Sequence, residues 1–124
     1  MKLIRIGDSL TFGYGVHLSQ RWTRLCAQET GWELVNEGIN GDTTGGMLAR
    51  MQGGVLAELR EGGLGADRPY VLLMGGSNDV FYSGSDAAAR GNMGAMIHQL
   101  FSVGVLPVVG TPLPADAPHA PRAF

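Results

Sequence analysis

Near its N-terminus the chain reads Leu3-Ile4-Arg5-Ile6-Gly7-Asp8-Ser9-Leu10-Thr11-Phe12-Gly13-Tyr14-Gly15. The apolar start predicts a buried strand over residues 2–6, and the glycines that follow predict a sharp turn. Ser9 is therefore expected just beyond the carboxyl end of a strand, where open α/β sheets bind their ligands. A hydroxyl there can act as a nucleophile, but Asp8 and Ser9 can equally be ordinary turn or helix-capping residues.

Two familiar glycine motifs do not fit this segment. Position 11 is Thr, so the segment is not a Gly-x-Ser-x-Gly nucleophile elbow. No Lys-Ser or Lys-Thr pair follows the glycines, as a phosphate-binding loop requires. The assignment of Ser9 therefore depends on what the later strand ends carry.

The rest of the chain alternates helices with strands. Further strands are predicted at 33–36, 70–74 and 105–109, and the unbroken apolar run of the second of these indicates a parallel sheet buried on both faces. The predicted helices are 19–31 with Ser19 as its N-cap, one that carries Met47 to Leu59 and ends at Gly62-Gly63, and 86–103. This βαβαβαβ order predicts one α/β domain over residues 1–124 with a parallel sheet covered on both faces.

A flavodoxin-like strand order 2-1-3-4 would bring three loops together at one sheet edge. These loops carry Ser9, Gly41 and Asn78. The backbone N–H groups of Ser9 and Gly41 and the side-chain amide of Asn78 could then stabilise an oxyanion that forms when Ser9 attacks an acyl group. Taken singly, turn geometry can explain Gly41 and an Asx turn can explain Asn78.

Composition narrows the classes of partner. Hydrophobic residues make up 44% and charged residues 16% of the chain, and the net charge is −2 with no basic stripe, so nucleic acid is not expected to bind. No apolar run approaches the roughly 20 residues of a membrane span. Met1-Lys2 lead directly into the first predicted strand, which leaves no room for a signal peptide and favours a cytoplasmic location. The single cysteine, Cys26, is expected to be a reduced core residue.

Three blocks of this sequence resemble those of the GDSL esterases and lipases, also called SGNH hydrolases. Gly7-Asp8-Ser9-Leu10 resembles the block that names the family, and residues 36–43 resemble its second block, whose last glycine, here Gly41, is an oxyanion donor. Gly76-Ser77-Asn78-Asp79 resembles the third block, whose first Asn, here Asn78, is the other donor. The resemblance implies a flavodoxin-like three-layer α/β/α fold and a serine ester hydrolase. Such an enzyme cleaves small-molecule esters through an acyl-enzyme intermediate, without metal or cofactor.

The family's fourth block, Asp-x-x-His, supplies the catalytic base and the acid that orients it. Asp116-Ala117-Pro118-His119 has those letters, but it follows the fourth strand and so comes one βα unit too early. The chain is therefore interpreted as the N-terminal portion of such an enzyme, with little or no esterase activity by itself. A non-catalytic chain that binds an acyl or carbohydrate ligand remains the alternative, and a nucleotide binder is disfavoured because the fingerprint residues are missing. Lipid esters, acetylated sugars and thioesters all remain compatible as substrates, and the oligomeric state is open.

Overall fold

In the computed structural model, which describes residues 1–62 and 69–112, four parallel strands form one sheet in the order β2-β1-β3-β4. The strands are β1 (Lys2–Gly7), β2 (Glu33–Gly38), β3 (Tyr70–Met74) and β4 (Pro107–Gly110). The predicted flavodoxin-like order is therefore confirmed. The second strand runs two residues beyond its predicted end, and Pro107 occupies the first position of β4, where its missing N–H is tolerated.

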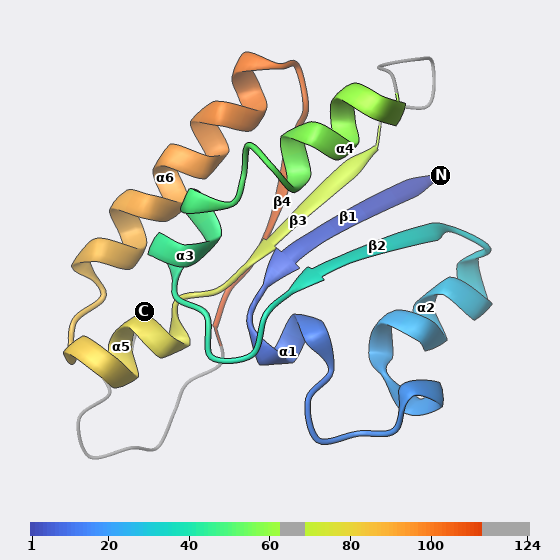
Figure 1. Ribbon diagram of the computed structural model, residues 1–124, viewed down its shortest axis with the longest axis horizontal. Coiled ribbons are helices and arrows are strands. Elements are labelled where there is room, and N and C mark those ends of the chain that lie inside the picture. Colours follow the sequence, from blue (N-terminus) through green and yellow to red (C-terminus); the bar gives the residue numbers. More distant parts are fainter. Residues whose placement is uncertain (63–68, 113–124) are drawn as a thin grey trace.

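Three helices cover one face of the sheet (Figure 1). They are α3 (Thr44–Ala49), α4 (Val55–Gly62) and α6 (Ala87–Ser102). Because side chains alternate along a strand, every second residue of β1 and β3 faces these helices. The buried core lies between the two layers and consists of Ile4, Ile6, Met47, Met51, Val55, Leu56, Leu59, Val71, Leu73, Met96, Leu100 and Val105.

The prediction of one continuous helix from Met47 to Leu59 was wrong. The chain leaves α3 at Arg50 and enters α4 at Val55, with Gly53 and Gly54 in the connection. A glycine inside a helix costs about 1 kcal/mol relative to Ala, and here two occur in succession. The apolar residues on both sides of the break still reach the same core, which is why their spacing resembled one helix.

Helix α2 (Trp22–Thr30) follows the 3₁₀ turn η1 (Leu18–Gln20). It packs against β2 on the side of the sheet opposite to α3, α4 and α6. Ser19 lies inside the 3₁₀ turn, and extended Arg21 is the N-cap of α2, so the predicted cap was wrong. Gly31 ends the helix in the left-handed conformation, as predicted. Cys26 is only partly buried, because this face of α2 is not enclosed by the described residues.

Two short helices missed by the sequence patterns lie at the carboxyl edge of the sheet (Figure 1). They are α1 (Ser9–Phe12), directly after β1, and α5 (Ser77–Ser83), directly after β3. Four and seven residues are too few for a helical period to stand out in a sequence. Both helices begin within the blocks that carry Ser9 and Asn78.

The α2 side of the sheet is less well covered over β3 and β4. Val108 pairs with Leu72 in register, and 48% of Val108 is exposed, as is 38% of Trp22 on α2. Within the described residues β4 pairs only with β3, so its other edge is open. Apolar open edges invite pairing with other chains.

We therefore expect the 124-residue chain to self-associate in solution. Size-exclusion chromatography with light scattering should give masses above that of the monomer, increasing with concentration. Val108→Lys should lower this association, because a charge on an edge strand disfavours pairing. A monodisperse monomer with a sharp cooperative melt would contradict the expectation.

Candidate functional site

Ser9 is the first residue of α1 and is partly buried. Asp8 is the N-cap of this helix, and its Oδ1 accepts a hydrogen bond of 2.9 Å from the backbone N–H of Leu10. Burial is the main cause that raises the pKa of the Asp8 carboxyl. The Ser9 hydroxyl has no hydrogen-bonding partner within residues 1–62 and 69–112, so it is available for chemistry.

Gly7 allows the turn into α1 to lie against the neighbouring strand. A Cβ at this position would collide with the Thr11 hydroxyl and with the backbone carbonyl of Met74 on β3. The Gly7 carbonyl accepts a hydrogen bond of 3.1 Å from the Ile39 N–H, beyond the end of β2. The segment before Ser9 is therefore joined directly to the segment that leads to Gly41.

Gly41 lies in the turn between β2 and α3 with a φ of +76°, a conformation that side chains disfavour. The turn is closed by a 3.2 Å hydrogen bond from the Asp42 N–H to the Ile39 carbonyl. The Tyr82 hydroxyl of α5 donates to the Gly41 carbonyl at 3.4 Å. This carbonyl is thus partnered on the α5 side of the turn.

Asn78 is the second residue of α5. Its Nδ2 donates a hydrogen bond of 2.9 Å to the backbone carbonyl of Asp42, the residue after Gly41. An amide NH₂ group has two N–H donors, so one can fix the side chain while the other remains for a ligand. The structure thus joins the three predicted segments pairwise, the Ser9 segment to the Gly41 turn and the Gly41 turn to Asn78.

Asp79 is a supporting residue that sequence reasoning did not identify. Its buried carboxylate accepts hydrogen bonds from the Thr44 N–H at 2.8 Å and the Thr44 hydroxyl at 2.6 Å. Asn92 of α6 donates to the same hydroxyl at 3.1 Å. The two bonds from Thr44 hold the start of α3 against α5. In the sequence, only the position of Asp79 beside Asn78 in the third block could have indicated this role.

Arg50, at the C-terminal end of α3, is the second such residue. Its guanidinium reaches the carbonyls of Gly7 and Glu37 and the carboxylate of Asp42. Nothing in the local sequence distinguishes it from an exposed helix arginine, because these partners are separated from it by 8 to 43 positions.

No catalytic base is found among the described residues. His17 and His98 are both exposed, and neither is hydrogen-bonded to Ser9 in the described part of the chain. Asp116 and His119 lie outside the described residues.

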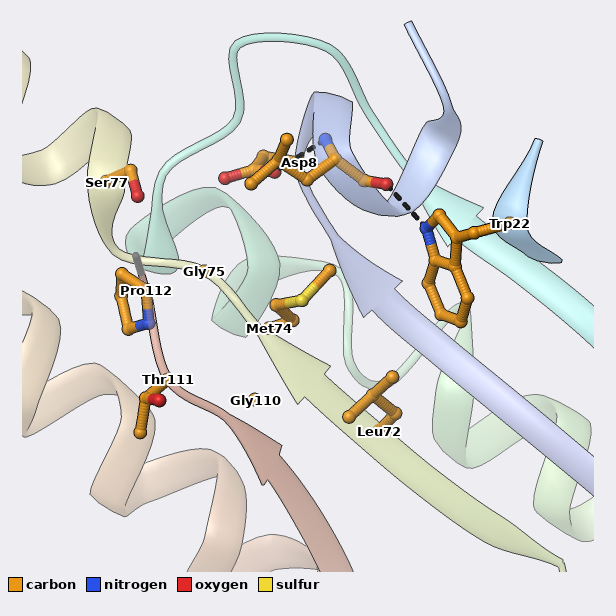
Figure 2. A pocket seen from close by; sticks show the side chains of 10 residues that line it. Asp8, Trp22, Leu72, Met74, Gly75, Ser77, Gly110, Thr111 and Pro112 are labelled. Carbon is orange, nitrogen blue, oxygen red and sulfur yellow. Dashed lines mark hydrogen bonds between the residues drawn. The ribbon is translucent and has the colours of Figure 1, made fainter. Parts of the chain in front are cut away.

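A hollow of about 530 Å³ opens beside Asp8, between Trp22 and the ends of β3 and β4 (Figure 2). Ser77 and Pro112 lie on one side of it and Trp22 on the other, with Leu72 and Met74 of β3 between them. Its walls are mainly apolar. The aromatic residues Phe12, Tyr14, Phe81 and Tyr82, which lie near Ser9 in the sequence or the structure, are not among the residues that line it.

The described residues contain neither a metal-binding cluster nor a helix that could span a membrane. No group of three His, Cys, Asp or Glu side chains there could hold a metal ion. No helix in the same residues has the length and apolar character needed to cross a bilayer.

Comparisons with known proteins agree with this architecture. The sequence profile of the GDSL-like lipase/acylhydrolase family matches residues 6–124. Esterase TesA from Pseudomonas aeruginosa is 28% identical over 97% of this chain and 58% of its own length. A protein of the G-D-S-L lipolytic family from Desulfitobacterium hafniense DCB-2 superimposes with a TM-score of 0.80 at 27% identity, covering 94% of this chain and 62% of its own.

The esterase AlinE4, of the SGNH-hydrolase family, superimposes with a TM-score of 0.72 at 25% identity, covering 87% of this chain and 57% of its own. The chain thus spans about three fifths of the length of these relatives, 58% in the case of TesA. With this sheet order, these three loops and a family profile that matches nearly the whole sequence, the chain belongs to the GDSL-like lipase/acylhydrolase family.

Proposed function

We propose that the described residues form the nucleophile and oxyanion hole of a serine ester hydrolase. Ser9 is the nucleophile, and the N–H groups of Ser9 and Gly41 and the amide of Asn78 are the oxyanion donors. The observation that carries this proposal is the pair of hydrogen bonds Ile39 N–H to Gly7 carbonyl and Asn78 Nδ2 to Asp42 carbonyl, at 3.1 and 2.9 Å. They hold three separate loops at one sheet edge, where the donors can converge on one substrate oxygen.

The reaction proceeds in two steps. The Ser9 oxygen attacks the ester carbonyl carbon as a base removes its proton, and the carbonyl oxygen becomes an oxyanion that the three donors stabilise. The carbon–oxygen bond to the alcohol then breaks, the alcohol takes the proton, and an acyl-Ser9 ester remains. Water attacks this ester in the same way and releases the carboxylic acid and free Ser9. The base comes from outside the described residues.

The relatives support esters as the substrate class, since one is named an esterase and another belongs to the SGNH-hydrolase family. We further propose a small or medium acyl group. The apolar hollow next to the Asp8–Leu10 segment favours such a group. The side chains of Leu10, Trp22 and Met74 that line it can pack against an uncharged acyl chain but would not stabilise a charged one.

A series of p-nitrophenyl esters from acetyl to dodecanoyl tests this function. Mixing each ester with the 124-residue chain should release p-nitrophenol slowly, up to one equivalent per Ser9, because acylation releases one alcohol per site and no base among the described residues speeds it. The alternative is a non-catalytic chain that binds acyl ligands. It predicts saturable binding of a decanoyl ligand by calorimetry and, for every ester, the same release of p-nitrophenol from the unsubstituted chain as from Ser9→Ala.

His119→Ala is expected to leave Ser9 reactivity in the 124-residue chain unchanged. Phosphonylation of Ser9 by a fluorophosphonate should be slow and should rise with pH throughout the range 6 to 10, because no histidine removes the hydroxyl proton. A rate that levels off above about pH 7, as histidine titration gives, and that is lost in His119→Ala would show that His119 is the base.

A further inference from the structure

The guanidinium of Arg50 donates hydrogen bonds to three different segments of the chain. Its Nε donates to the Asp42 carboxylate at 2.9 Å, its Nη1 to the Glu37 carbonyl at 2.6 Å, and its Nη2 to the Gly7 carbonyl at 2.9 Å. No other described side chain donates to all three segments. We propose that Arg50 is a positioning residue for ester hydrolysis, holding Ser9, Gly41 and Asn78 in one arrangement; this inference rests on the proposed function.

The two carbonyls lie at the carboxyl ends of neighbouring strands. Gly7 of β1 pairs with Gly38 of β2, so the Gly7 and Glu37 carbonyls belong to adjacent strand ends. One planar guanidinium bonded to both fixes the distance between the segment entering Ser9 and the segment entering Gly41. Lysine cannot replace it, because an ammonium is a point charge without a rigid set of parallel donors.

Asp42 connects Arg50 to two of the three proposed oxyanion donors, Gly41 and Asn78. Its side chain is paired with Arg50, its backbone carbonyl accepts from Asn78 Nδ2 at 2.9 Å, and its N–H follows Gly41 directly. If Asp42 moved, both the Gly41 turn and the Asn78 amide would lose their orientation. A shift of about 1 Å at a reacting centre costs on the order of 10²-fold in rate.

Arg50 also has an electrostatic effect. A carboxylate next to Gly41 would repel the negative charge that develops on the substrate oxygen. The Asp42 and Arg50 side chains are only 14% and 21% exposed, so solvent screens this charge poorly. The guanidinium neutralises the Asp42 carboxylate and so reduces the negative charge beside the oxyanion site.

Gly46 provides an independent way to disturb the same pair. A Cβ at position 46 would collide with Oδ1 of the Asp42 carboxylate, so this carboxylate, whose Oδ2 accepts from Arg50, has to shift. A Cβ at neighbouring Gly45 would meet Asn92 Nδ2 at 3.6 Å, an ordinary contact. Both glycines lie in α3, so Gly46→Ala and Gly45→Ala are equal in their effect on helix propensity and differ in their effect on Asp42.

The test compares Arg50→Ala, Arg50→Lys and Gly46→Ala with two controls in the 124-residue chain. The controls are Gly45→Ala and Arg60→Ala, since exposed Arg60 donates to a single carbonyl, that of Gln52 at 3.2 Å. One readout is the maximal rate of Ser9 phosphonylation and the reagent concentration for half-saturation. The other is amide hydrogen exchange at Ile39 and Asp42, whose N–H groups close the loop, with Leu73 of β3 as the reference.

Arg50→Ala and Gly46→Ala should lower the maximal rate by about 10²-fold with little change in half-saturation, and exchange at Ile39 and Asp42 should accelerate while Leu73 stays protected. Arg50→Lys should recover only part of the rate, and added methylguanidinium should raise the rate of Arg50→Ala alone. The two control variants should match the unsubstituted chain.

Unchanged exchange at Ile39 and Asp42 in Arg50→Ala would overturn the role of Arg50, whatever happens at Ser9. Faster exchange with an unchanged Ser9 rate, or full activity in Arg50→Lys, would overturn it as well. An unsubstituted chain that is not phosphonylated at Ser9 at any pH would instead refute the proposed function and with it the catalytic part of this inference. The exchange data would still decide whether Arg50 holds the loop.

Discussion

Ser9→Ala is expected to abolish covalent modification of this chain by a fluorophosphonate and to remove the slow, stoichiometric release of p-nitrophenol. The hydroxyl oxygen is the only atom that the substitution deletes, and no described residue is hydrogen-bonded to it. The fold should therefore survive, because Asp8 continues to cap α1 through the Leu10 N–H. Intact-protein mass spectrometry and circular dichroism measure the two effects.

Ser77→Ala is the matched control for this prediction. Ser77 lies at the start of α5 at the same sheet edge and lines the hollow beside Asp8, but it belongs to no proposed step. Its removal should leave labelling unchanged. Labelling that persists in Ser9→Ala, or that disappears in Ser77→Ala, would show that the nucleophile was assigned to the wrong serine.

Asn78→Ala is expected to lower the maximal rate of Ser9 acylation by about 10²-fold, with a smaller change in the ester concentration for half-saturation. The reason is that the amide donates to the oxyanion, which exists only in and near the transition state. Single-turnover stopped-flow kinetics with p-nitrophenyl acetate separate the two parameters.

Asn92→Ala serves as the control, since the Asn92 amide donates to the Thr44 hydroxyl at 3.1 Å and takes no part in the proposed chemistry. It should change the acylation rate far less than Asn78→Ala. A change in Asn78→Ala confined to half-saturation would mean that the amide binds the ground state and is not an oxyanion donor.

The strand order and the meeting of three loops could be predicted because each depends on local signals. Apolar runs identify parallel strands, glycines identify their ends, and topology then places the ends of β1, β2 and β3 at one edge. The positive φ of Gly41 also agrees with the expectation of a tight turn. The hydrogen bonds that join the loops were not predictable, although the loops were.

What the sequence could not provide depends on contacts between distant positions. Arg50 and Asp79 have partners 43 and 35 positions away, and no periodicity or spacing encodes such pairs. Cys26 shows the same limit. It was expected in the core but is only partly buried, because burial depends on what packs against this face of α2 within the described residues.

The central claim is that Ser9, Gly41 and Asn78 converge on one oxygen atom. The most direct test is a crystal structure of the chain after phosphonylation of Ser9, in which the phosphoryl oxygen stands in for the oxyanion. We predict that this oxygen lies about 2.7–3.1 Å from the backbone N of Ser9, the backbone N of Gly41 and Nδ2 of Asn78. A phosphoryl oxygen that points away from Gly41 and Asn78, or an adduct on a different residue, would contradict the account.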